Sequence, residues 1–533
     1  MNAQQGFDML APEQWAETPA HVRLHLLEEV RERLKTYGRE LAESDTKMKN
    51  DLMGEELYSV ETSMMSTVVP VANTLTACIH LYEHLLKGHM PKAEKIVKVK
   101  EGVYDVEVKP LDSKDRLLAG TQKFHLRVKG QPHQTNPFDK PAGIIAVSGA
   151  GNYSSSLEMV KAIFLENKAV IHKPHQLNEE TDRVWEKIFQ PLVDAKAIAF
   201  IDADQGRAMT QLEGLDKIYF TGSTAVAKAI DRAAKVPLIS ECGGNNPCII
   251  VPGDKPWTAK QMEHQAIQIA TISKLNGGAV CGRIQTLVTS RNWSQREEFL
   301  AALEKAIVEQ TPAMGTYYPK SEKVAEAFIE HYPNAKILKP ENGKYNHGSF
   351  VLISDVDPES YATQNEAFCQ IIDEVALDVP TSPEAFLPAA VSFCNEKLLG
   401  TLGSSIIVDE GTKKAHKDAV NQAITDLEYG AVTLNTMPPL VFLSPYLTWG
   451  GNEEGKEFVS GVGNFGNAYC FENVQKSILE DQFTSPGHMM VTNKKAFDHL
   501  ASNMAEFAVA PTWMNLTKMM GTTVVDQMRH KDF

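Results

Sequence analysis

The chain has 533 residues, and because single hydrophobic cores stop growing at about 250–300 residues, two or more domains are expected. With 43% hydrophobic and 23% charged residues, the composition is that of an ordinary globular protein. The formal net charge of -15, without a Lys/Arg run, argues against a nucleic-acid-binding protein, which needs basic clustering.

Cysteine usage favours a reducing compartment, because an odd number of cysteines without a CxxC spacing is no disulfide framework. Residues 1–5 do not begin a secretory signal. The most apolar stretch, 68–79, is too short for a bilayer and is interrupted by Pro70 and Asn73. We therefore expect a cytoplasmic protein with no membrane partner.

The first part of the chain is predicted to be helical to about Lys87, because apolar residues recur there at helical spacing. These are Val22, Leu26, Val30, Leu34 and Leu41. From 103 to 108 and from 124 to 128 the period becomes two, which predicts strands with one wet face. Such strands form a hairpin or an arm that reaches a neighbouring subunit.

An α/β pattern follows. Residues 143–147 predict a strand, 154–166 a helix and 169–172 the next strand, which is a βαβ unit with a parallel sheet. A second unit is predicted from strands at 198–201 and 217–220, with helices near 206–212 and after Gly222.

Two residues in the middle of the chain suggest covalent chemistry on a carbonyl carbon. Cys281 follows the small, flexible run 276–280, and Glu241 stands just before the pair Gly243-Gly244. A thiol can attack and a carboxylate can activate water, which are the two functions needed to form and hydrolyse a thioester. The alternative for Cys281 is a small buried core thiol.

Several separated motifs occur together in a fixed order over about 141–477, and through them the chain resembles the aldehyde dehydrogenase superfamily. They are Gly151-Asn152-Tyr153, Lys173-Pro174, Phe220-Thr221-Gly222-Ser223-Thr224, Glu241 with Gly243-Gly244, Asn276 to Cys281, Asn365-Glu366-Ala367-Phe368, and Asn435 before Pro438-Pro439.

The resemblance implies a set of catalytic roles. Cys281 would be the nucleophile, and Asn152 would donate its side-chain amide to the oxyanion together with the backbone N–H of Cys281. Glu241 would activate the water that hydrolyses the thioester. Members that pass the acyl group to coenzyme A generally lack this glutamate, so its presence favours release of a free carboxylic acid.

The resemblance also implies a nicotinamide dinucleotide, NAD or NADP. Its predicted binding residues are Lys173 and Gln176 at the adenosine ribose, Gly222 and Ser223 at a phosphate on a helix N-terminus, and Gly243, Glu366 and Phe368 near the nicotinamide end. Gln176 replaces a carboxylate of the family pattern, so NADP acceptance is predicted. The run Gly149-Ala150-Gly151 is not a GxGxxG fingerprint, and a standard Rossmann site is not predicted.

The expected fold is α/β and aldehyde-dehydrogenase-like, with a dinucleotide-binding lobe, a catalytic lobe and a β-strand oligomerisation arm. A small-molecule aldehyde is the expected substrate, and the arm predicts a homodimer or homotetramer. The predicted divisions are 1–121 (helical part and start of the cofactor lobe), 122–140 (arm), 141–242 (dinucleotide lobe), 243–435 (catalytic lobe), 436–480 (return segment) and 481–533 (C-terminal extension of unknown role).

Two alternatives come from other features. His80, Glu83 and His84 form an HxxEH pattern, which on a helix is typical of inverted zinc peptidases with two histidine ligands and a glutamate base. The second is a protein with the family fold and impaired catalysis, because the chain departs from the family pattern at His175-Gln176, Ala227 and Cys369-Gln370.

Overall fold

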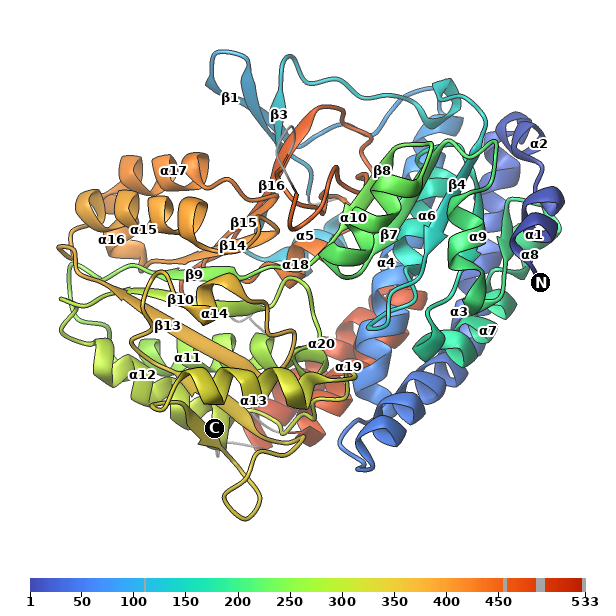
Figure 1. The fold of residues 1–533 in the computed structure, drawn as a ribbon. Coiled ribbons are helices and arrows are strands. Elements are labelled where there is room, and N and C mark those ends of the chain that lie inside the picture. The colour runs from blue at the N-terminus through green and yellow to red at the C-terminus, as the bar shows by residue number, and fades with distance from the viewer. Residues whose placement is uncertain (110–111, 454–457, 486–493, 530–533) are drawn as a thin grey trace.

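The computed structural model describes residues 1–109, 112–453, 458–485 and 494–529. The expected α/β fold is confirmed: strands of these ranges form a large mixed sheet and a separate parallel sheet, each covered by helices (Figure 1). Of the predicted divisions, 454–457 in the return segment and 486–493 and 530–533 in the C-terminal extension lie outside the described residues.

The smaller sheet is parallel, in the order β6-β5-β4-β7-β8. All five residues of its central strand, β4, are buried, since helices cover both faces. The strands are β4 (Ile144–Ser148), β5 (Ala169–Lys173), β6 (Ile198–Phe200), β7 (Lys217–Thr221) and β8 (Leu238–Glu241). Its helices are α6 (Ser156–Phe164), α7 (Glu179–Ile188), α8 (Gln190–Asp194), α9 (Gly206–Thr210) and α10 (Thr224–Ala233).

The larger sheet has the order β1-β2-β3-β16-β15-β14-β9-β10-β13-β12-β11. Its strands are parallel from β16 to β12 and antiparallel at both ends. They are β1 (Lys95–Lys100), β2 (Val103–Glu107), β3 (Lys123–Lys129), β9 (Asn246–Ile250), β10 (Ile284–Ser290), β11 (Lys336–Leu338), β12 (Phe350–Ile353), β13 (Ile371–Leu377), β14 (Gly403–Ile407), β15 (Ala431–Leu434) and β16 (Val474–Glu480).

Helices on both faces of the large sheet bury separate cores, because strand side chains alternate between the faces. In β9, Ile249 packs with α13, α15 and α17, whereas Cys248 and Ile250 pack with α11 and α12. The helices are α11 (Ala259–Lys274), α12 (Arg296–Lys305), α13 (Ser321–His331), α14 (Tyr361–Gln364), α15 (Pro383–Lys397), α16 (Glu410–Ala415), α17 (Lys417–Asp426) and α18 (Pro439–Phe442).

The N-terminal part consists of α1 (Ala3–Met9), α2 (Pro12–Glu17) and two long helices, α3 (Ala20–Met53) and α4 (Val60–Leu86). The predicted helical character to about Lys87 is therefore correct. The predicted face differs slightly: Val22 is exposed and Arg23 is buried instead. The Arg23 guanidinium lies over the Trp15 ring and donates to the side-chain oxygen of Asn167, which compensates for its burial.

The sequence suggested that Pro70 interrupts the apolar stretch. In the structure Pro70 lies inside α4, and the helix continues through it. By length and composition α4 could cross a membrane, but 61% of its most apolar window is buried inside the structure. It packs along α3, α6 and α19. Its neighbours supply the apolar environment that a proline-containing helix needs for stability, because most helical stability comes from tertiary packing.

The C-terminal extension forms α19 (Lys494–Val509) and α20 (Trp513–Arg529). Helix α19 lies against α4 and α3, so this C-terminal helix packs on the two long N-terminal helices (Figure 1). Ala501, Ala505 and Ala508 are buried in this contact side of α19, and their small side chains allow close helix packing.

The two strands predicted for the arm, at 103–108 and 124–128, pair antiparallel as β2 and β3. Between them lies α5 (Ser113–Ala119). Two partners were not predicted: β1 pairs with β2, and β16 pairs with β3. The arm is therefore an antiparallel extension at one end of the large sheet, with β1 at its edge (Figure 1).

Candidate active site

The loop that presents Cys281 has an unusual backbone. It leaves α11 through the turn η4 (Leu275–Gly278), where Asn276, Gly277 and Gly278 all have positive φ, at 50°, 65° and 82°. A Cβ on Gly278 would lie 2.4 Å from the backbone carbon of Cys369, so this position requires glycine on two counts. The glycines of the sequence motif therefore serve to bring the loop tightly against the neighbouring segment.

The backbone at Cys281 is fixed by Asn246 at the start of β9. The Asn246 amide donates to the carbonyl oxygens of Cys281, at 2.6 Å, and of Arg283, at 2.8 Å, and its own oxygen accepts the Gly403 N–H. One buried side chain thus links three segments. A nucleophile held on such a rigid support keeps its orientation toward a substrate.

Glu241 is the last residue of β8 and is 2% exposed. Its strand is braced by the return segment, because Ser240 N–H donates to Val462 and Cys242 N–H donates to Ser460. Burial raises the pKa of Glu241 to about 8, and the neighbouring Cys281 thiol and Trp449 indole only partly offset this. The carboxyl is therefore largely protonated at neutral pH.

The pKa of the Cys281 thiol is raised well above its ordinary value, first by burial and then by the negative charges of Glu241 and Glu366. This direction is opposite to the lowered pKa that is general for reactive thiols. A neutral thiol needs a base to remove its proton during attack. In its ionised form, Glu241 is the carboxyl beside the sulfur that can take this proton.

Asn152 lies on the loop between β4 and α6, and its amide donates to the Ala279 carbonyl, at 3.1 Å. An NH₂ group carries two hydrogens, so a second N–H remains for an oxyanion. Asn276 reinforces the contact from the other side, because its amide donates to Ala279 O, at 3.2 Å, and to Asn152 O, at 3.4 Å. The predicted oxyanion donor and the nucleophile loop are thus joined by hydrogen bonds.

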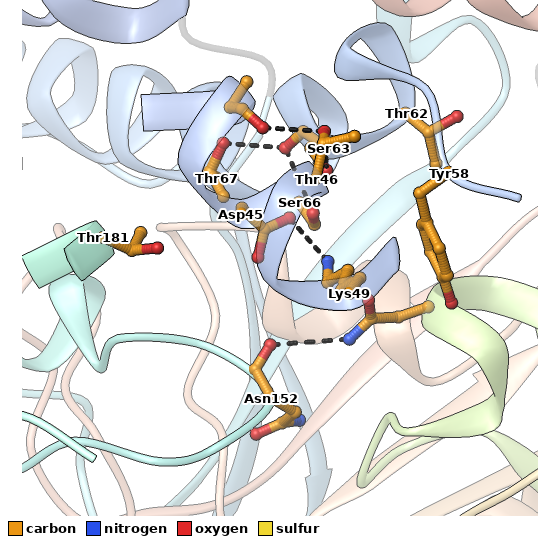
Figure 2. Close-up of polar contacts among 12 residues, drawn as sticks. Asp45, Thr46, Lys49, Tyr58, Thr62, Ser63, Ser66, Thr67, Asn152 and Thr181 are labelled. Carbon is orange, nitrogen blue, oxygen red and sulfur yellow. Dashed lines mark hydrogen bonds and ion pairs between the residues drawn. The ribbon is translucent and has the colours of Figure 1, made fainter. Parts of the chain in front are cut away.

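A buried polar layer lies behind this junction, on α3 and the start of α4 (Figure 2). Asp45 and Lys49 form an ion pair at 2.6 Å, and both are almost fully buried. The Lys49 ammonium lies 5.2 Å from the ring centre of Tyr58 and 5.4 Å from that of Tyr317, whose hydroxyl accepts from Asn276. The N-terminal helices therefore support the catalytic loops through cation–π and hydrogen-bond contacts.

Glu366 follows the turn after α14, and its carboxylate lies directly over Gly243. A Cβ on Gly243 would lie 1.7 Å from Glu366 Oε1, so a larger residue there would displace this carboxylate. Burial raises the pKa of Glu366 to about 7, although the Arg283 cation and the Gly244 N–H favour its charged form. This carboxyl is held at the junction of β8 and the large sheet.

Phe368 also has positive φ, 48°, which is a strained conformation for a bulky residue. Its ring meets that of Tyr318 edge to face, with centroids 5.0 Å apart. Tyr318 in turn reaches Gly151, where a Cβ would lie 2.7 Å from its hydroxyl. The two aromatic rings thus form a wall between the two lobes.

One pocket of about 250 Å³ brings together eight of the ten predicted site residues. These are Asn152, Gly222, Ser223, Glu241, Gly243, Cys281, Glu366 and Phe368. Lys173 and Gln176 are not among its lining residues. Lys173 ends β5, with its side chain against Gly206, and Gln176 is exposed in the short turn η2 (Gln176–Asn178).

The N-terminus of α10 faces this pocket. Its N-cap residue, Ser223, makes no side-chain cap hydrogen bond, so its hydroxyl does not occupy the first-turn N–H groups. Such a helix end favours an anion.

The structure gives no support to the zinc alternative. His80 and His84 are on one side of α4, with ring centroids 4.4 Å apart, and both have lowered pKa values, chiefly through burial. Among the residues that the structure describes, no group of three His, Cys, Asp or Glu side chains could hold a metal ion.

Trp449, Tyr318, Asn246 and Asn276 were not identified as site residues from the sequence. Trp449 closes over Gly282, where a Cβ would lie 2.6 Å from its ring, and no local pattern marks it. Asn246 and Asn276 could have been considered, since a polar residue beside each glycine pair is a candidate for fixing a tight backbone. The place of Tyr318 in the site depends on how the two lobes pack together, which no local sequence pattern shows.

Comparison with known proteins identifies the class. Residues 121–476, two thirds of the chain, match the model of the aldehyde dehydrogenase family, and the chain belongs to this family. Human aldehyde dehydrogenase family 3 member B2 is 27% identical over 195 residues, covering 34% of the chain and 49% of the relative. The chain thus spans about half the length of several curated relatives it matches.

A longer match is to the rat "Aldehyde dehydrogenase, dimeric NADP-preferring", 24% identical over 373 residues, with 64% of the chain and 74% of the relative covered. Among solved structures, the NADP-dependent glyceraldehyde-3-phosphate dehydrogenase of Bacillus halodurans in complex with NADP has a TM-score of 0.60. It is 18% identical, and the match covers 88% of each chain. This similarity establishes the fold.

Proposed function

We propose that the protein oxidises an aldehyde to the carboxylic acid with NAD or NADP, through a thioester on Cys281 that Glu241 helps to hydrolyse. The observation that carries the proposal is the single pocket in which Cys281, Glu241 and Asn152 meet Ser223, Glu366 and Phe368. Family membership supports the same reaction class.

The residues present fit a nicotinamide dinucleotide. Gly222 and Gly243 line the pocket, and the N-terminus of α10 suits a phosphate. Lys173 and Gln176 would lie at the ribose end and Glu366 and Phe368 at the other. When bound, the dinucleotide accepts a hydride from the substrate carbon. A solved neighbour bound to NADP supports this choice of cofactor class.

The protein's own groups carry the other steps. Glu241 takes the thiol proton as the Cys281 sulfur bonds to the carbonyl carbon, and the Asn152 amide donates to the resulting oxyanion. After loss of the hydride the carbon is held as a thioester. Glu241, once it has released the thiol proton to bulk water, takes a proton from the attacking water as the carbon–oxygen bond forms; the carbon–sulfur bond then breaks, and the departing sulfur takes that proton to restore the Cys281 thiol.

The Glu241→Gln variant tests this scheme, because glutamine keeps the size of the side chain but removes the base. Steady turnover of an aldehyde should fall by about 10²- to 10⁴-fold. Stopped-flow absorbance should still show a burst of about one reduced cofactor per site, slowed if Glu241 also deprotonates the thiol. Mass spectrometry should find the acyl group on Cys281.

Two controls define the outcome. Cys281→Ala should abolish both the burst and the slow phase, whereas Cys242→Ala, which removes the other thiol of the pocket, should retain the burst. A Glu241→Gln enzyme that turns over at the wild-type rate would remove Glu241 from the mechanism, and an acyl group on Cys242 would reassign the nucleophile.

NADP acceptance belongs to the same proposal. A carboxylate at position 176 would repel a 2′-phosphate, and Gln176 removes that repulsion; the effect is modest because the residue is exposed. Gln176→Glu should shift the kcat/KM ratio toward NAD, and an unchanged ratio would show that this residue does not contact the phosphate. We further propose a cytoplasmic homodimer or homotetramer; the dimeric rat relative supports the dimer.

A further inference from the structure

Glu158 is a buried carboxyl for which the proposed reaction has no use. It lies in the first turn of α6, every residue of which is buried, and is itself 2% exposed. Burying a charged or polar group is costly unless other groups compensate. Neighbouring groups must therefore compensate for the burial of Glu158.

Several groups favour the charged form of Glu158. The Tyr153 hydroxyl donates to its Oε1 atom, the Thr221 hydroxyl lies 3.5 Å from the same oxygen, and the Lys161 ammonium is one turn further along α6. A carboxylate in the first turn is also stabilised by the helix dipole. Burial raises the pKa of Glu158, and these partners oppose that effect.

Thr221 connects Glu158 with Glu241. The two strands β7 and β8 pair in parallel with Thr221 opposite Glu241, so both side chains point to the same face of the sheet. The Thr221 hydroxyl that contacts Glu158 therefore lies beside the Glu241 carboxyl. In addition, Glu158 Oε2 and Glu241 Oε1 are both buried without a hydrogen-bond partner in the structure.

Aromatic rings close the other side of this cluster. The Tyr153 ring packs edge to face on Phe442, with centroids 5.5 Å apart, and Phe442 packs on Trp449, which contacts Glu241. Apolar walls of this kind keep the local dielectric constant low. Charges in such a site interact more strongly than they do in water.

We propose that Glu158 and Glu241 form a coupled pair of carboxyls, in which Glu158 carries the negative charge and thereby keeps the proton on Glu241. Glu158 is then a positioning residue that sets the pH at which Glu241 becomes a base. The inference rests on the proposed function of Glu241. The ionisation of Glu241 in this proposal makes or breaks no bond to carbon. It only moves one proton from the Glu241 carboxyl to bulk water.

The assignment of the charge follows from the partners of each group. Two close carboxyls do not readily ionise together, and the proton remains on the one with fewer stabilising contacts. Glu158 has the helix N-terminus, a phenol and an ammonium, whereas Glu241 has the thiol and the indole. The titratable and charged groups around the pair are Tyr153, Lys161, Tyr219, Cys281, Glu366 and, through Lys161, Cys78 on α4.

The test is the pH profile of deacylation in Glu158→Gln. An aryl acetate can acylate Cys281 without any cofactor, and stopped-flow absorbance separates the burst of aryl alcohol from the later hydrolysis. The deacylation rate of the wild type should rise with pH as Glu241 loses its proton. In Glu158→Gln the midpoint should move to lower pH by about one unit, because the neighbouring charge is gone.

Glu166→Gln is the matched control. It also removes a carboxyl from this lobe, but one that pairs with Lys140 and Lys217, and its midpoint should equal that of the wild type. Tyr153→Phe removes only the hydrogen bond to Glu158 and should shift the midpoint in the same direction by less. A wild-type midpoint in both Glu158→Gln and Tyr153→Phe would overturn the inference; if Glu158→Gln does not fold, Tyr153→Phe decides alone.

The same assay separates this inference from the proposed function. If Cys281→Ala retains the burst, or Glu241→Gln deacylates like the wild type, the proposed chemistry fails. If both behave as expected while the Glu158→Gln midpoint stays unchanged, only the coupling of the two carboxyls fails.

Discussion

At the scale of single residues, the site combines two weak acids that oppose each other's ionisation. Burial is the first cause of the raised pKa of both groups; the charges of Glu158 and Glu366 add to it at Glu241, and the charges of Glu241 and Glu366 add to it at the Cys281 thiol. A neutral thiol is a weaker nucleophile than a thiolate. It becomes reactive when substrate binding places a carbonyl carbon beside the sulfur.

Cys281 should be the first cysteine to react with iodoacetamide. It is partly exposed, whereas the other six cysteines are buried. Because the thiol is neutral at rest, labelling should accelerate as the pH is raised, and not follow the fast kinetics of a permanent thiolate. Mass mapping of the first modified peptide against time and pH measures this; early modification of another cysteine with activity retained would be inconsistent with the assignment.

The raised pKa of Glu241 also predicts a pH-dependent stability. A carboxyl ionises at about 4.3 in the unfolded chain but at about 8 in the native protein. Between these values the unfolded state holds fewer protons, so the native state loses stability as the pH rises. The loss is at most about 1.4 kcal/mol per pH unit and ends above pH 8.

Glu241→Gln has no such proton, so the Tm of the variant minus that of the wild type should grow from pH 5 to pH 8. Differential scanning calorimetry of both proteins in matched buffers measures this difference. Glu366 titrates in both proteins, so its contribution to the difference in Tm largely cancels. A difference in Tm that is constant over this range would show that the Glu241 carboxyl ionises normally.

At the scale of elements, periodicity predicted the parts of the chain in which packing follows local pattern. The strands and helices predicted between 143 and 233 are all present, because buried parallel strands and covering helices impose simple apolar patterns. Helix α7 was not predicted, although its first turn carries three acidic residues, which favour a helix N-terminus. Helix α8 was also not predicted.

Other elements depend on tertiary contacts. The Pro70 position reads as a break in a local pattern, yet α4 continues through it because helices on several sides bury it. Strand β1 is fully exposed and has no buried face, although valine and lysine alternate at 97–100 and could have identified it. It is a strand because β2 pairs with it.

In the candidate site, too, some residues could be predicted from local sequence patterns and others depend on tertiary contacts. Motifs located Cys281, Glu241 and Asn152, since their roles require particular residue types beside glycines. The supports come from distant parts of the chain: Lys49 from α3, Asn246 from β9 and Trp449 after α18. No short-range pattern can report such contacts, because each depends on how the sheets and helices are placed.

At the scale of the whole molecule, segments next to strands of both sheets line the pocket, and helices from the two ends of the sequence pack on one another. The N-terminal helices support the Asn276 loop through Lys49, and α19 packs on those helices. The large sheet ends at β1, whose backbone groups on one side have no strand partner among the described residues. An open edge of this kind can accept another strand or surface.

We expect this edge to be covered in an oligomer. In the single chain Ile96, Val97 and Val99 are 51%, 43% and 38% exposed, which is unusual for three apolar side chains on one short strand. If the arm joins two copies, Val97→Lys should place a charge in the interface and weaken it. Light scattering with size-exclusion chromatography should then show dissociation to monomers at concentrations where the wild type stays assembled.

Val22→Lys is the control, since Val22 is similarly exposed, at 37%, but lies on α3 far from β1 in sequence. This variant should retain the wild-type mass. Far-ultraviolet circular dichroism should be the same for all three proteins, because β1 contributes no buried residues to the core. A Val97→Lys protein that remains assembled like the wild type would place the interface elsewhere, and a monomeric wild type would remove the arm's proposed role.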